Sequence, residues 1–189
     1  MDNIVIFGAP GSGKGTYSAA LVEKFGYRHI STGDVLRAEI REGTQLGRIA
    51  EKYIENGQLI PDDLIIDMLA DVYDTMGEGP GVIFDGFPRT IVQAKALKEM
   101  LAARGEKISV TLNLIVSEDV LMERLLNRAK IEGRSDDNEQ TIRNRFNVYY
   151  SQTHPLIEWF RQEGVLSEFT FKGDKDRMIQ EIIDKVASL

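Results

Sequence analysis

The chain has 189 residues, of which 42% are hydrophobic and 28% are charged, as expected for one globular domain with its own core. Its formal net charge of -7 argues against nucleic acid or an anionic membrane as a partner. No apolar run approaches the ~20 residues of a membrane span, so a cytoplasmic protein is expected. The absence of cysteine excludes disulfides, thiol nucleophiles and cysteine metal sites, and the two histidines, His29 and His154, lie far apart.

Short apolar strands alternate with helical patterns along the whole chain. Strands are predicted at 4–7, 27–30, 82–84, 110–116 and 168–171, and helices at 16–25, 35–40, 62–73, 91–103, 118–130, 139–163 and 175–189. This alternation predicts an α/β domain of three layers, with a central, mainly parallel five-stranded sheet covered on both faces. Ligands of such sheets bind at the carboxyl ends of the strands. The polar segment 130–138 lies between two predicted helices and is expected to form a flap.

The stretch GAPGSGKGT follows the first predicted strand and leads into the first predicted helix. Gly8, Gly13 and Lys14 fit the phosphate-loop pattern G-x-x-x-x-G-K-[ST], in which glycines turn backbone N–H groups toward phosphate and the lysine reaches the outer phosphates. Position 15 departs from this pattern, because Gly15 replaces the hydroxyl residue that usually coordinates magnesium and the hydroxyl comes at Thr16. Other groups are therefore expected to organise magnesium.

The loop resembles that of the adenylate kinases and their nucleoside monophosphate kinase relatives. Three further stretches carry the same resemblance in order along the chain: ISTGDVLR (30–37), FDGFPRT (84–90) and GRSDDNEQTIRNR (133–145). The resemblance implies a P-loop fold whose parts are a core (1–30, 61–126 and 138–189), a mobile AMP-binding segment (31–60) and a short mobile lid (127–137). The implied activity is reversible, Mg²⁺-dependent phosphoryl transfer from ATP to AMP, giving two ADP, by a monomer.

Four arginines lie in or near the polar flap and suggest an anionic ligand. Arg124 and Arg128 are four residues apart on one predicted helix face, and Arg134 and Arg145 lie just across the flap. A transferring phosphoryl group carries charge on its oxygens, which such cations stabilise. The resemblance implies catalytic roles for Lys14, Arg89, Arg128, Arg134 and Arg145. It implies ATP contacts for Gly11, Ser12, Gly13, Lys14, Gly15, Thr16, Arg124, Arg128 and Gly173.

The segment STGD predicts a helix start capped by Ser31, with Thr32 and Arg37 suited to a second anionic ligand at the same helix end. Related UMP/CMP kinases carry Ala in place of Thr32, so this residue favours AMP. Gln93 follows Arg89 by four residues and is expected on the same helical face. An amide can donate to and accept from an adenine edge, and the resemblance assigns Gln93 that role. The resemblance implies AMP contacts for Thr32, Arg37, Gln58, Leu59, Ile60, Gly86, Phe87, Pro88, Arg89, Gln93, Arg134 and Arg145.

Two acidic positions are candidates for organising magnesium. Asp85 ends a predicted strand beside the phosphate loop and could hold the ion through its waters. The resemblance implies that Asp136, on the flap, acts on the ion indirectly. Two positions depart from the commonest family pattern, since Tyr17 stands in place of Gln and Ala129 in place of Gly. Neither departure removes a charged group, but Ala129 could stiffen the hinge of the lid.

Two alternatives remain open from the sequence. A UMP or CMP kinase could use the same scaffold, although Thr32 argues against it. A nucleotide-binding switch without an acceptor would use the phosphate loop alone and would have no use for Arg37, Arg89 and Gln93 together. Assays with different monophosphates, and with no acceptor, would distinguish these classes.

Overall fold

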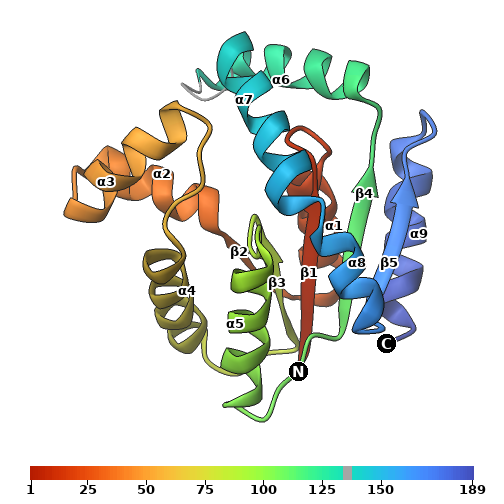
Figure 1. Ribbon diagram of the computed structural model, residues 1–189. Helices are drawn as coiled ribbons and strands as arrows, with labels where there is room; N and C mark the ends of the chain where they lie inside the picture. The colour runs from red at the N-terminus through yellow and green to blue at the C-terminus, as the bar shows by residue number, and fades with distance from the viewer. Residues whose placement is uncertain (134–137) are drawn as a thin grey trace.

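A computed structural model describes residues 1–133 and 138–189 as three layers around a parallel sheet (Figure 1). Within these residues the strands are β1 (Asp2–Gly8), β2 (Arg28–Ser31), β3 (Gly81–Asp85), β4 (Val110–Ile115) and β5 (Leu166–Thr170), in the order β2-β3-β1-β4-β5. Every pairing is parallel, and Ile6 of β1 lies opposite Asp85 of β3. The loops after the strands therefore meet at one edge of the sheet, and the predicted five-stranded parallel sheet is confirmed.

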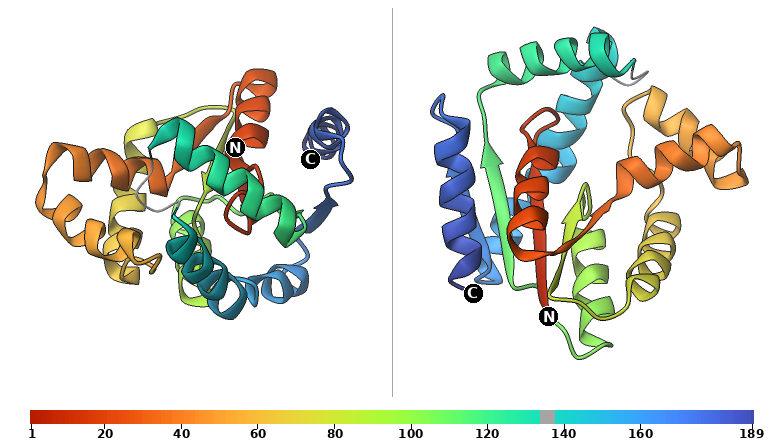
Figure 2. Two further views of the ribbon diagram at one scale, coloured as in Figure 1. Left: turned by 90° about the horizontal axis from the view of Figure 1, so that it is seen from above. Right: turned by 180° about the vertical axis from the view of Figure 1, so that it is seen from behind.

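Helices cover both faces of the sheet because successive residues of each central strand point to opposite sides. Ile4 and Ile6 of β1 join the cluster under α1 (Lys14–Phe25) and α9 (Lys175–Ala187). Val5 and Phe7 join the larger cluster on the other face, which includes residues of α4 (Asp62–Met76), α5 (Ile91–Ala102) and α8 (Leu156–Gln162). Figure 2 shows α1 and α9 together on the side opposite α4 and α5. The residues of β1 and β3 are buried on both faces, which explains the near-continuous apolar runs of the central strands.

Two helices, α2 (Thr32–Glu42) and α3 (Gln45–Glu55), project from the sheet as an antiparallel pair, here called the arm (Figure 1). Ser31 caps α2 as predicted, because its Oγ accepts from the backbone N–H of Asp34 at 3.3 Å. Helix α3 has no counterpart among the predicted helices. Gly47 allows it to pack closely on α2, since a Cβ there would overlap the backbone carbonyl of Glu39.

The segment after the flap forms two helices joined by a π-turn, so the predicted single helix over 139–163 is wrong. Helix α6 (Glu118–Glu132) precedes the flap, and α7 (Glu139–Val148), the π-helix η1 (Tyr149–Thr153) and α8 follow it. The break has a local cause, because Pro155 lacks a backbone N–H and α8 begins directly after it. Ala129 lies inside α6, where alanine is a strong helix former.

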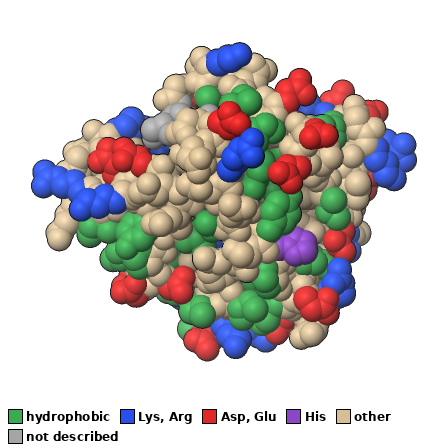
Figure 3. All heavy atoms as spheres, turned by 45° about the horizontal axis from the view of Figure 1, so that its top comes forward, with side chains coloured by type: hydrophobic (Ala, Val, Ile, Leu, Met, Phe, Trp, Pro, Cys, Tyr) green, Lys and Arg blue, Asp and Glu red, His purple; other side chains and the backbone are tan. Residues whose placement is uncertain are grey.

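Acidic and basic side chains are interspersed over the face seen in Figure 3 rather than separated into large patches of one sign. In the described residues, none of the helices is both long enough and apolar enough to span a bilayer.

Candidate active site

The phosphate loop connects β1 to α1 at the carboxyl edge of the sheet. Its tight course requires glycine at Gly11 and Gly13, whose φ angles are +82° and +101°. The ammonium group of Lys14 donates to the carbonyls of Gly8 at 3.2 Å and Ala9 at 3.4 Å, so it lies folded across the loop. A Cβ at Gly15 would meet no atom within 4 Å, so a hydroxyl residue at this position would not be excluded by the protein around it.

Several charged groups surround the Lys14 ammonium. Its pKa is lowered to about 8, chiefly by burial; the Asp85 carboxylate raises it, and the guanidinium groups of Arg89, Arg145 and Arg128 contribute to lowering it. The fold therefore brings three arginines that are distant in sequence close enough to Lys14 to interact with its charge. Such a site favours a multiply charged anion, because the anion would offset both the repulsion and the loss of hydration.

A cavity of about 520 Å³ opens above the phosphate loop and extends to the arm. Most of the predicted ATP-binding residues and Asp85 line this cavity. Ser12 of the phosphate loop is fully buried and Gly173 lies elsewhere, so neither is part of the lining. The predicted residues in its wall are Gly11, Gly13, Lys14, Gly15, Thr16, Arg37, Asp85, Gly86, Arg89, Arg124, Arg128 and Arg145. The predicted Arg134 and Asp136 lie outside the described residues.

Arg124 connects α6 to the phosphate loop. Its Nη1 donates to the backbone carbonyls of Gly11 at 3.3 Å and Ser12 at 3.4 Å. Its guanidinium carbon also lies 4.6 Å from the ring centroid of Phe171, a cation–π contact with the segment that leads to Gly173. Arg124 therefore supports the shape of the loop from outside, a structural role that its place among the predicted ligands did not indicate.

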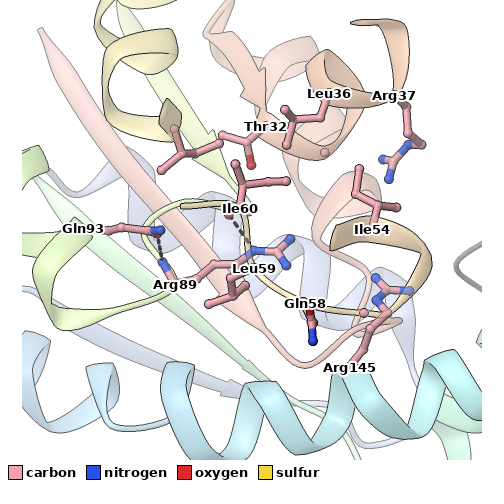
Figure 4. A pocket seen from close by; sticks show the side chains of 14 residues that line it. Thr32, Leu36, Arg37, Ile54, Gln58, Leu59, Ile60, Arg89, Gln93 and Arg145 are labelled. Carbon is pink, nitrogen blue, oxygen red and sulfur yellow. Dashed lines mark hydrogen bonds between the residues drawn. The ribbon is translucent and has the colours of Figure 1, made fainter. Parts of the chain in front are cut away.

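A smaller cavity of about 80 Å³ lies beneath the arm and adjoins the larger one (Figure 4). Arg37, Arg89 and Arg145 line both cavities and therefore stand at the boundary between them. Phe87 is buried in the core instead, and Pro88 lines a third cavity of about 40 Å³ behind the phosphate loop. The predicted residues in the wall of the smaller cavity are Thr32, Arg37, Gln58, Leu59, Ile60, Gly86, Arg89, Gln93 and Arg145.

Arg89 and Gln93 are in contact, but not as neighbours on one helical face. Helix α5 begins at Ile91 with Thr90 as its N-cap, so Arg89 precedes the helix and the predicted common face is wrong. The backbone N–H of Arg89 donates to Oε1 of Gln93 at 2.8 Å, and Nε of Arg89 donates to the carbonyl of Gly86 at 2.8 Å (Figure 4). The turn 86–89 thus holds both side chains at the cavity wall.

His29 is a member of the site that the sequence motifs did not indicate. Its Nε2 lies 3.0 Å from Oδ2 of Asp85, because β2 and β3 are paired in parallel with His29 opposite Ile83, which places His29 and Asp85 on the same face of the sheet. The available signal was the position of His29 near the end of the second predicted strand, beside the strand that ends in Asp85. The described part of the chain contains no group of three or more His, Asp or Glu side chains arranged to hold a metal.

A protein-family model described as Adenylate kinase matches residues 6–165, which is more than half of the chain. The chain belongs to the adenylate kinase family. It is 58% identical over all 189 residues to an adenylate kinase of Bacteroides thetaiotaomicron, and each chain is covered completely. The adenylate kinase of Phocaeicola vulgatus is also 58% identical over both full lengths, and that of Porphyromonas gingivalis is 52% identical over 98% of this chain and 97% of its own. The predicted class, an ATP:AMP phosphotransferase, is confirmed.

Proposed function

We propose that this adenylate kinase transfers the outer phosphoryl group of ATP to AMP across the larger cavity, with ATP on the phosphate loop and AMP in the smaller cavity beneath the arm. One observation carries the proposal: Arg37, Arg89 and Arg145 stand at the boundary of the two cavities, with Lys14 facing the larger one. A boundary lined by cations suits a phosphoryl group that passes from one nucleotide to the other.

On the donor side, the phosphates of ATP would occupy the N-terminus of α1. Backbone N–H groups of residues 11–16 would bind the phosphate oxygens there, with the positive end of the helix dipole behind them. The Lys14 ammonium would exchange its two carbonyl partners for the outer phosphates. Arg124 and the backbone at Gly173 would flank the base, since both adjoin the Phe171 ring or its segment.

On the acceptor side, AMP would lie between the arm and the turn 86–89. Gln93 and Thr32, both almost fully buried in the cavity wall, would face the base, and residues 58–60 would cover it. Arg89, whose guanidinium is oriented by the Gly86 carbonyl, would bind the phosphate, since its planar fork matches phosphate oxygens.

The reaction requires little covalent assistance from the protein. An oxygen of the AMP phosphate forms a bond to the outer phosphorus of ATP while the bond from that phosphorus to the leaving ADP oxygen breaks. Lys14, Arg89, Arg128 and Arg145 would stabilise the charge on the oxygens of the transferring group. Arg134 would add a further cation from the lid. Closing of the lid (127–137) and the arm over both nucleotides would exclude water, as adenylate kinase lids do.

The donor groups present fit a magnesium ion that accompanies ATP. Mg²⁺ keeps several waters and is held in proteins by one or two carboxylates together with substrate phosphates. Asp85 supplies one carboxylate, 7% exposed and in the wall of the larger cavity. When bound, magnesium would neutralise charge on the phosphates. Asp85 would orient its waters, His29 would hold the Asp85 carboxylate through their 3.0 Å contact, and Asp136 would act indirectly.

The test is ADP formation from ATP with AMP, UMP, CMP or no acceptor. We expect AMP to be strongly preferred, and turnover without an acceptor to be negligible. A preference for UMP or CMP would show that AMP is not the acceptor. Turnover of ATP without an acceptor would favour a nucleotide switch. Thr32→Ala is the matched variant, since it should lower the AMP/UMP ratio with little loss of stability. We also expect the protein to be cytoplasmic and monomeric. Light scattering, which gives the molar mass in solution, tests the oligomeric state.

A further inference from the structure

We propose that Asp62 fixes the orientation of the Gln93 amide and thereby makes the acceptor site select adenine over hypoxanthine. The inference rests on the proposed function, in which Gln93 contacts the acceptor base. Asp62 is the first residue of α4, outside all four sequence motifs and outside the lining of the smaller cavity. Its role would be to position Gln93, with no contact to the substrate itself.

The Gln93 amide is held at both ends. Its Nε2 donates to Oδ1 of Asp62 at 2.7 Å, and its Oε1 accepts from the backbone N–H of Arg89 at 2.8 Å. The side chain is only 3% exposed, and the backbone N–H of Gln93 donates to Oγ1 of Thr90 at 3.2 Å. Figure 4 shows the amide in the cavity wall beside Arg89. The network connects the start of α4, the turn before α5 and the first turn of α5.

These two partners determine which end of the amide is oxygen. A carboxylate only accepts hydrogen bonds, and a backbone N–H only donates. A flipped Gln93 would place its Oε1 against the Asp62 oxygen and its NH₂ group against the Arg89 N–H, so both bonds would become repulsive contacts. The assignment of the amide is therefore set by the surrounding groups. Each end also keeps a further bonding position, one lone pair on Oε1 and one hydrogen on Nε2.

An amide with a fixed orientation distinguishes two purine bases that have the same shape. Adenine offers a donor at its 6-amino group and an acceptor at N1, and an amide carbonyl beside an amide N–H complements this pair. Hypoxanthine offers an acceptor at O6 and a donor at N1, which an amide in the opposite orientation would complement. The Asp62 carboxylate therefore favours AMP over IMP by preventing the flip, because a mismatched base would leave buried polar groups unpaired.

The experiment compares kcat/KM for AMP and for IMP, with ATP as donor, in the wild type, Asp62→Asn and Asp62→Ala. An asparagine at position 62 can accept from or donate to the amide in either orientation, and an alanine does neither, so in both variants only the Arg89 N–H still specifies the orientation of Gln93. We expect the AMP/IMP ratio to fall about tenfold in each, the effect of one lost hydrogen bond. Asp63→Asn is the matched control, since this neighbour is exposed on the same helical turn, and its ratio should stay at the wild-type value.

The ratio separates positioning from a purely structural role. Equal loss of activity toward both monophosphates, or an unchanged ratio in folded Asp62→Asn and Asp62→Ala, would overturn the proposal. Thermal unfolding checks that each variant is folded, and calorimetric binding of AMP and IMP gives the same ratio if turnover is too slow to measure. A wild type that does not phosphorylate AMP would refute the proposed function instead, so the two failures are distinguishable.

Discussion

Raising the pH from 7.5 to 9.0 is expected to weaken ATP binding about eightfold through the titration of Lys14. The pKa of this residue is lowered to about 8, chiefly by burial, with Arg89, Arg145 and Arg128 contributing. A bound polyphosphate favours the charged ammonium and raises the pKa again. The empty protein therefore loses a proton as the pH rises through 8, and binding must restore it, so affinity is highest below pH 8 and falls above it.

The magnitude follows from linkage between proton and ligand binding. If the complex keeps Lys14 charged, the apparent dissociation constant rises in proportion to 1 + 10^(pH − pKa), which is about 1.3 at pH 7.5 and about 11 at pH 9.0 for a pKa of about 8. At pH 8 about half a proton should be taken up for each nucleotide bound. The phosphates of ATP are largely ionised over this range, and their remaining titration would strengthen rather than weaken binding as the pH rises.

Titration calorimetry with ATP and no divalent ion, in two buffers of different ionisation enthalpy, measures both the affinity and the number of protons taken up. Lys14→Arg is the control, because its guanidinium stays charged at all of these pH values and its proton uptake should be near zero. A wild-type affinity that is constant from pH 7.5 to 9.0, or equal proton uptake by the wild type and Lys14→Arg, would refute the assigned electrostatic origin.

Three substitutions test other parts of the structure. Arg89→Ala should reduce AMP-dependent ADP formation at least about 100-fold because it removes a phosphate-binding cation, while the thermal midpoint changes little; unchanged turnover would exclude that role. Asp85→Asn should raise the magnesium concentration needed for half-maximal rate while leaving metal-free ATP binding nearly intact, and an unchanged magnesium requirement would contradict the assignment. Gly47→Ala should lower the free energy of unfolding in urea by about 2 kcal/mol, because its methyl group would overlap the Glu39 carbonyl, and wild-type stability would show that the arm adapts.

The sheet was predictable because its physical signals are local. Each strand is a short apolar run bounded by turn residues, and the alternation with helical patterns leaves a parallel sheet as the simplest arrangement. Helix α3 was not predicted, since its packing on α2 depends on the missing side chain of Gly47, a tertiary contact. The break in 139–163 was also missed, although Pro155 marks the point where the helix must restart.

The site shows the same division between local and tertiary information. The phosphate loop and Asp85 follow from motifs at strand ends, which the fold brings to one edge. The contact of His29 with Asp85 needed the strand pairing, and the bond from Gln93 to Asp62 joins two helices that no local pattern relates. The prediction that Arg89 and Gln93 share a helical face was wrong because Thr90, which lies between them, is the N-cap of α5.

The segment that contains the arm leaves the core after Ser31 and returns at Pro61, and residues at its two ends, Thr32 and Ile60, line the same cavity. An insertion with neighbouring ends can be exchanged between relatives without altering the path of the remaining chain. Under the proposed function, an exchanged arm would change the residues that cover the acceptor base, while Gln93, Arg89, the sheet and the phosphate loop stay as they are. The same property makes the arm a natural unit for grafting in enzyme engineering.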